Sequence, residues 1–165
     1  MDKVIIALFA FLGGAVFQNY RAARSEEGAL INEHIKDIEK FSDAAQSYWL
    51  KTPKDEEEEA ASAARVRVAH AGTTFLYEDI SRICAARCDR YQKGMKALYH
   101  SATGGAFESA KRNMDAERAM ATADCAAKLI HTLRVSRSDL LSIRHMARVI
   151  KWWFQELWRN HGPKP

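Results

Sequence analysis

Residues 4–20, VIIALFAFLGGAVFQNY, set the organisation of the chain, because no charged side chain interrupts them. As a helix, this segment spans about 26 Å, close to the short limit for crossing a hydrocarbon core of about 30 Å. Lys3 precedes the segment, and Arg21 and Arg24 follow it. The excess of positive charge on the C-terminal side indicates that this side is cytoplasmic. The sequence therefore predicts a transmembrane anchor in residues 1–24.

Two alternatives to a retained anchor remain for this segment. A cleaved signal peptide also begins with a basic residue and a short apolar run. However, no clear Ala-x-Ala site follows here, and the helical pattern continues past Arg24. A buried core helix is disfavoured because the segment is hydrophobic on all sides. Ala10 and Gly14 form a small-xxx-small pair, which favours self-association within a membrane.

Beyond the anchor, apolar residues recur at three- and four-residue steps, which predicts helices. Only three prolines and eight glycines interrupt the chain, too few for a many-stranded β-fold. The predicted fold class is all-α, with one N-terminal transmembrane helix followed by a cytoplasmic bundle of about four helices in residues 25–165. The helices expected in this bundle cover residues 30–51, 53–98 with a kink at 72–74, 107–135 and 136–161.

Local sequence also predicts where these helices begin and end. Thr52 suits an N-cap and Pro53 suits the first helical position. The run Glu56–Glu59 then falls in the first turns, and we interpret it as a solvated group that complements the helix dipole rather than as a cation site. Ser136 or Ser138 is predicted to cap the last helix.

The sequence contains no phosphate-cradling glycine loop, no Gly-x-Ser-x-Gly elbow and no His-Glu-x-x-His motif. Its three cysteines, Cys84, Cys88 and Cys125, are an odd number, which fits a reducing cytoplasm better than a disulfide framework. They lack the paired spacing of zinc ligands, so we interpret them as buried structural residues. We therefore expect neither an enzyme nor a bound metal or cofactor. A cavity formed by His131, His145 and Cys125 would favour an enzyme instead.

The C-terminal end is the basic part of the chain. The last thirty residues carry six basic and two acidic side chains, so the net charge of +4 is concentrated there. A row of cations with an aromatic side chain among them can hold phosphates and stack a base. The candidate ligand-binding residues are Arg134, Arg137, Arg144, Arg148, Lys151, Trp152 and Arg159.

Two other interpretations of this basic row stay open. It can lie at the membrane surface, with its tryptophans at headgroup depth, or its aromatic side chains can simply pack in the bundle. A long nucleic acid is disfavoured as a partner, because the rest of the chain carries no net charge.

The short anchor, the helix IKDIEKFSDAAQSYWLK at residues 35–51 and the helical domain resemble, in layout, the small membrane effectors of bacterial antiviral systems. Effectors associated with type III CRISPR systems and single-span effectors linked to retrons share this plan. The resemblance implies a homo-oligomer in the bacterial inner membrane. Its cytoplasmic domain would sense a cyclic oligoadenylate, and its membrane part would then damage the host bilayer. The alternative is a constitutive membrane-tethered scaffold or adaptor without a small-molecule ligand.

Overall fold

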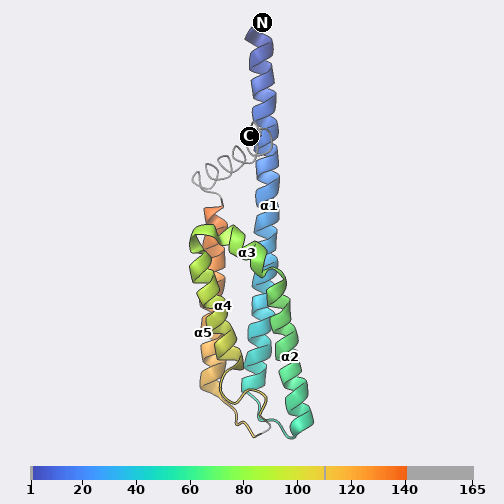
Figure 1. The fold of residues 1–165 in the computed structure, drawn as a ribbon, viewed down its shortest axis with the longest axis vertical. Helices are drawn as coiled ribbons and strands as arrows, with labels where there is room; N and C mark the ends of the chain where they lie inside the picture. Colours follow the sequence, from blue (N-terminus) through green and yellow to red (C-terminus); the bar gives the residue numbers. More distant parts are fainter. Residues whose placement is uncertain (1, 110, 141–165) are drawn as a thin grey trace, which may run out of the picture.

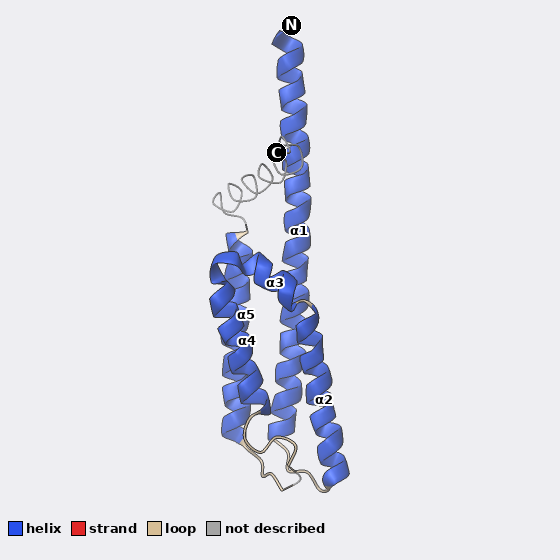
Figure 2. Ribbon diagram, viewed as in Figure 1, coloured by secondary structure: helices blue, strands red, loops and turns tan. Residues whose placement is uncertain are grey.

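The computed structural model describes residues 2–109 and 111–140, and only the backbone of residues 2–13, 15, 16 and 19. This part of the chain folds into helices and loops without a strand, which confirms the predicted all-α class (Figure 2). The four long helices are α1 (Asp2–Trp49), α2 (Glu56–Phe75), α4 (Cys88–Thr103) and α5 (Ala116–Asp139). The short helix α3 (Tyr77–Cys84) and the 3-10 helix η1 (Ala85–Arg87) connect α2 to α4.

Helix α1 extends well beyond the bundle. Its 48 residues span about 72 Å at 1.5 Å per residue. Figure 1 shows its N-terminal part projecting past the other described helices, while its C-terminal part packs among them. Among the α1 residues with described side chains, Gly28 is the first that is buried. The predicted anchor segment and the helix predicted at residues 30–51 are therefore one continuous helix.

The predicted anchor falls mostly on residues of which only the backbone is described, so its membrane insertion stays a prediction. Where the structure describes side chains, no helix combines the length and the apolar character needed to cross a bilayer.

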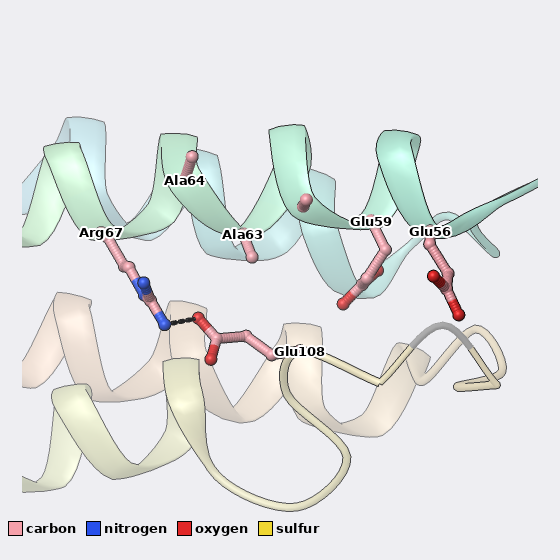
Figure 3. A pocket seen from close by; sticks show the side chains of 7 residues that line it. Glu56, Glu59, Ala63, Ala64, Arg67 and Glu108 are labelled. Atoms are coloured by element: carbon pink, nitrogen blue, oxygen red, sulfur yellow. Dashed lines mark ion pairs between the residues drawn. The ribbon is translucent and has the colours of Figure 1, made fainter.

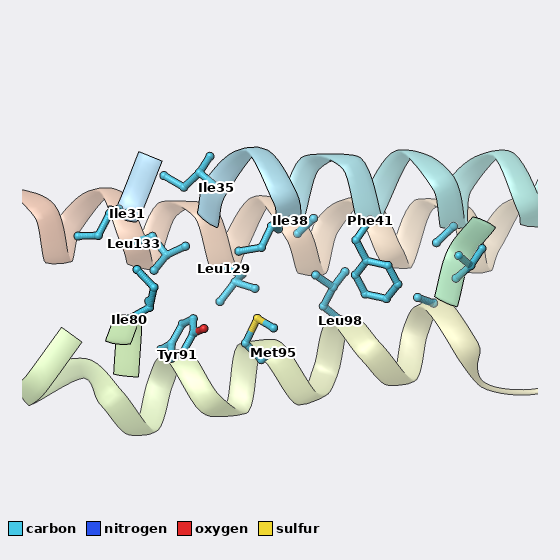
Figure 4. Packing of buried hydrophobic residues seen from close by; sticks show 14 of the residues in the cluster. Ile31, Ile35, Ile38, Phe41, Ile80, Tyr91, Met95, Leu98, Leu129 and Leu133 are labelled. Carbon is cyan, nitrogen blue, oxygen red and sulfur yellow. The ribbon is translucent and has the colours of Figure 1, made fainter. Parts of the chain in front are cut away.

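Helix α1 forms the centre of the bundle, with α2 and α5 packed along it and α4 packed along α5. Isoleucine and phenylalanine side chains from one face of α1 point toward α4 and α5 (Figure 4). They meet aromatic, methionine and leucine side chains from those helices, and together they form one continuous core. Its labelled members in Figure 4 are Ile31, Ile35, Ile38, Phe41, Ile80, Tyr91, Met95, Leu98, Leu129 and Leu133.

The single helix predicted for residues 53–98 is wrong. The chain reverses direction between α2 and α4, and the short α3 crosses the end of the bundle between them (Figure 1). The helix is interrupted at Leu76 and again at Ala85, which has φ 42° and ψ −98°. The reversal buries Ile80 and Cys84 over the end of the core. The first interruption lies just beyond residues 72–74, where a kink was expected, because α2 continues to Phe75.

The start of α2 differs from the prediction as well. Its N-cap is Asp55 rather than Thr52, and the Asp55 carboxylate accepts a hydrogen bond of 2.8 Å from the backbone N–H of Glu58. The Glu58 carboxylate in turn accepts one of 2.9 Å from the backbone N–H of Lys54. This reciprocal arrangement resembles a capping box, which stabilises a helix start better than a threonine alone.

Helix α5 also has other limits than predicted. It begins at Ala116 rather than near Phe107, because the Asp115 side chain caps it by accepting a 2.8 Å hydrogen bond from the backbone of Arg118. Ser136 and Ser138 lie inside α5, where their hydroxyl groups donate to carbonyl groups of the preceding turn. The prediction that either serine begins a new helix is therefore wrong. The predicted last helix lies outside the described residues.

Candidate anion-binding site

A cleft of about 480 Å³ lies where α1 leaves the bundle, between α1 and the end of α5. Residues of α1 separated by three or four positions line one wall, because such residues share a face of the helix. Residues at the C-terminal end of α5 line the other wall. The lining residues are Arg21, Arg24, Ser25, Gly28, Ala29, Asn32, Arg137 and Leu140.

Arg137, one of the predicted ligand-binding residues, lies across the cleft against α1. Its Nη1 donates a hydrogen bond of 3.0 Å to Oδ1 of Asn32. A Cβ atom added at Gly28 would lie 3.6 Å from Nε of Arg137. The guanidinium group therefore passes directly over α1 at the glycine, and a large side chain at position 28 would occupy its place.

Arg24 presents unused hydrogen-bond donors. Its Nη1 donates to the Tyr20 hydroxyl group, and its guanidinium carbon lies 4.9 Å from the centroid of the Tyr20 ring. Its Nε and Nη2 atoms are buried and have no hydrogen-bond partner in the described part of the chain. A buried cationic donor without an acceptor is costly, and an anion in the cleft would satisfy it.

The carboxyl group of Glu27 interacts electrostatically with the guanidinium group of Arg24. Burial raises the pKa of the Glu27 carboxyl group above its ordinary value, and the Arg24 charge acts in the opposite direction. The cleft itself is lined by three arginines, a serine and an asparagine, with no acidic residue among its lining. Its own side chains therefore favour a negatively charged occupant.

The structure places two of the seven predicted site residues. Arg137 lines the cleft, whereas Arg134 is exposed on α5, one turn earlier, and does not line it. The other five predicted residues, Arg144, Arg148, Lys151, Trp152 and Arg159, lie outside the described residues.

The sequence-based prediction missed Arg21, Arg24 and Asn32 as site residues. From the sequence alone, Arg21 and Arg24 are only charges that flank an apolar segment. Their spacing with Asn32 puts them on one helical face, which could have indicated a polar surface there. Only the fold shows that the end of α5 meets that face.

A second polar cluster is buried at the opposite end of the bundle. Glu59 is only 3 % exposed, and its Oε2 lies 2.9 Å from Nε of Arg112. The Tyr48 hydroxyl group donates to the other Glu59 oxygen, and the Arg112 guanidinium carbon lies 3.8 Å from the centroid of the Tyr48 ring. Arg112 also donates to the carbonyl group of Lys51. The interpretation of the whole Glu56–Glu59 run as solvated is therefore wrong for Glu59, although it is confirmed for the three preceding glutamates.

We interpret this second cluster as structural. Its charged groups satisfy one another, and they tie the 104–115 loop to α1 and α2. Burial and the hydrogen bond to Glu59 raise the pKa of Tyr48 to about 12, so its hydroxyl group stays protonated at neutral pH. The neighbouring pocket of about 410 Å³ lies between α2 and the loop, where Arg67 and Glu108 form an ion pair (Figure 3).

The cysteines are all free thiols. Cys84 is buried, and burial raises the pKa of its thiol, while Cys88 and Cys125 are half-buried. In the residues that the structure describes, no three His, Cys, Asp or Glu side chains are grouped to hold a metal ion. His131 is exposed on α5, and His145 lies outside the described residues, so their proposed convergence with Cys125 is not described.

Comparison with known proteins gives no match to this chain, whether to a family model, to a curated protein or to a solved structure.

Proposed function

We propose that the chain is a membrane-anchored, oligomeric effector of prokaryotic antiviral defence that senses an anionic signal nucleotide in the cleft between α1 and α5. The observation that carries this proposal is the position of the cleft. Arginines from two helices gather where the long α1 leaves the bundle, and two buried donors of Arg24 have no acceptor in the described part of the chain.

The expected ligand is a phosphate-bearing nucleotide of the cyclic oligoadenylate class. Guanidinium groups bind phosphates with paired, charge-assisted hydrogen bonds, and a ligand with several phosphates can contact α1 and α5 together. Residues 4–20 form the apolar anchor in the bacterial inner membrane, and the bundle lies in the cytoplasm.

The proposed mechanism couples ligand binding to the anchor through α1. Without ligand, Arg21, Arg24 and Arg137 repel one another across the cleft. A phosphate group between them favours a closer approach of α5 to α1. Because α1 is one continuous helix, a changed contact at its base alters the tilt of its N-terminal part. The ligand shifts the population between two arrangements of the anchors only as far as it binds them with different affinity.

The test is equilibrium binding of labelled cyclic oligoadenylates to the detergent-solubilised full chain. We expect the double variant Arg24→Ala/Arg137→Ala to lose at least about tenfold in affinity, since each charge-assisted contact contributes about 1.5 kcal/mol or more. Arg134→Ala is the matched control, because it removes an exposed arginine from the same helix outside the cleft.

Two results would contradict the sensing proposal. Binding that survives in the Arg24/Arg137 variant would place the site elsewhere, and Arg144→Ala/Arg148→Ala then tests the predicted C-terminal row. If the chain binds no cyclic oligoadenylate, whatever the number of nucleotides in its ring, a membrane-tethered scaffold without a small ligand is favoured.

A further inference from the structure

A cavity of about 410 Å³ opens between the C-terminal end of α2 and α4. Helix α2 packs on α1 and α4 packs along α5, so α2 and α4 flank α1 without packing along each other (Figure 1). The cavity shares no lining residue with the cleft between α1 and α5. Its volume lies in the range of small-molecule sites, which is about 300–1,000 Å³. It is therefore a second concave site, separate from the proposed nucleotide site.

Aromatic side chains line both ends of this cavity. Where α2 and α4 meet, the ring centroids of His70 and Tyr99 lie 4.6 Å apart. Tyr77 lines the cavity at its α3 end, and its ring centroid lies 5.6 Å from that of Tyr91. The buried Met95 supplies a further apolar surface from α4. Rings and a thioether favour contact with another aromatic ring, so we expect the apolar part of a ligand to be aromatic.

Two opposite charges from different helices also line the cavity. Glu78 comes from α3 and Lys96 from α4, and both are exposed. Neither forms an ion pair within the described part of the chain, where the neighbouring Arg82 pairs with Asp79 at 3.4 Å. Burial lowers the pKa of His70, so its ring adds no charge at neutral pH. The cavity thus presents one anionic and one cationic group, which suits a ligand that carries both charges.

We propose that this cavity binds a free aromatic amino acid. The carboxylate of Glu78 holds the ammonium group of the ligand, and the ammonium group of Lys96 holds its carboxylate. The aromatic ring of the ligand lies over Met95, between Tyr77 and Tyr99. A ligand with only one charge would meet one attracting and one repelling group, so the zwitterion is selected. This site depends neither on the membrane anchor nor on the nucleotide cleft.

Three related ligands separate the contributions of the two charges. L-Phenylalanine carries both charges, 2-phenylethylamine lacks the carboxylate, and 3-phenylpropionate lacks the ammonium group. Isothermal titration calorimetry of the full chain in detergent measures the dissociation constant of each. We expect L-phenylalanine to bind at least about threefold more tightly than either of the other two, which is the gain from one partly exposed charge pair.

Two charge-removing variants should give a crossed pattern. Glu78→Gln should weaken binding of L-phenylalanine and 2-phenylethylamine at least about threefold and should not weaken binding of 3-phenylpropionate. Lys96→Met should weaken L-phenylalanine and 3-phenylpropionate instead. The matched controls are Glu57→Gln and Lys93→Met, which change exposed residues outside the cavity. A general loss of folding would weaken all three ligands, so the crossed pattern requires direct contact.

A cavity-filling variant tests the location of the site. Thr74 is exposed and lines the cavity from α2, so the ring in Thr74→Trp should occupy the cavity and abolish binding of all three ligands. Ala71→Trp is the control, because it introduces the same ring at an exposed position of α2 outside the cavity. The helical circular dichroism of both variants should match that of the unaltered chain.

Each other outcome overturns the proposal. Absence of L-phenylalanine binding to the unaltered chain would exclude the site. Equal affinities for the three ligands would show an apolar cavity without recognition of charge. Binding that persists in the Thr74→Trp variant would place the ligand elsewhere. Nucleotide binding is measured with other ligands and other variants, so either site can fail without the other.

Discussion

Glu59 and Arg112 hold opposite charges 2.9 Å apart in the interior of the protein, where neither side chain is more than 4 % exposed. Removing one partner of such a pair leaves an uncompensated buried charge, which costs about 3 kcal/mol or more. We expect Glu59→Gln to lower the free energy of unfolding by about that amount in urea denaturation followed by circular dichroism.

The neighbouring Glu56 provides a matched control for this substitution. Glu56→Gln makes the same chemical change in the same helix turn at an exposed position, so it should alter stability by less than about 0.5 kcal/mol. Equal stabilities of the Glu56 and Glu59 variants would mean that the buried pair contributes nothing net to the fold.

His34 gives the protein a pH-dependent stability. It is fully buried, its Nε2 lies 2.8 Å from the Tyr91 hydroxyl oxygen, and its Nδ1 has no hydrogen-bond partner in the described part of the chain. Burial lowers the pKa of His34 to about 4, against a smaller opposing effect of Asp37. The folded state thus favours the neutral ring. Its stabilising contribution is complete above pH 6.5 and is lost as the pH falls toward 4.

Over that interval His34 should account for about 3 kcal/mol of lost stability, since each unit of pKa shift corresponds to about 1.4 kcal/mol. Unfolding free energies at pH 7 and pH 4 measure the loss. In the His34→Gln variant, the free energies of unfolding at pH 7 and pH 4 should differ by less than in the unaltered chain. In the control variant His100→Gln, which changes an exposed histidine, the difference should stay the same. Identical pH profiles for the unaltered chain and the His34 variant would assign the acid sensitivity to carboxylates.

At the scale of single side chains, a prediction from local charge patterns fails where the partners of a side chain lie far away in the sequence. Arg137 is a candidate because basic residues cluster near it in the sequence, and its role in binding stays a prediction. Glu59 was interpreted as solvated because its neighbours are glutamates, while its partners Arg112 and Tyr48 lie 53 and 11 positions away. No pattern in the sequence indicates that these positions are in contact; only the folded structure shows it.

Among the helices, the sequence period predicted helical structure correctly but did not show where the chain turns back. Residues 53–98 have a continuous helical pattern, and neither Leu76 nor Ala85, where the structure breaks it, is a typical helix breaker. The break is fixed by packing, because α3 buries Ile80 and Cys84 over the core. Tertiary contacts therefore override the local preference for one long helix.

Ala85 bears a conformational cost of that turn. Its φ of 42° lies in the left-handed region, which costs a residue with a Cβ atom about 1–2 kcal/mol. Ala85→Gly should therefore stabilise the protein by about 1 kcal/mol in thermal unfolding, even though glycine adds freedom to the unfolded chain. Ala86→Gly, at the next position and without positive φ, should not stabilise it. A loss of stability in both variants would show that the turn at Ala85 is unstrained.

The molecule as a whole divides at the point where α1 leaves the bundle. The described contacts of α1 with α2, α4 and α5 lie in its C-terminal half, and the cleft with Arg21, Arg24 and Arg137 marks the boundary. From hydropathy and charge, the sequence predicted an anchor that ends at residue 24, and that boundary stays a prediction. The sequence could not locate the cleft, which depends on which helix faces pack together.

This division predicts that the N-terminal part of α1 determines location rather than folding. Deletion of residues 2–20 keeps Arg21 and Arg24 and removes the apolar segment. The shortened chain should move from the membrane pellet to the supernatant and unfold at the same temperature as the full chain in detergent, because the core begins near Ile31.

As a control, replacing three residues of the apolar segment by leucine should keep the chain in the membrane. A shortened chain that stays in the pellet would show that another part of the protein, such as the C-terminal tryptophans, holds it at the bilayer. One that unfolds at a lower temperature would show that the projecting helix stabilises the bundle.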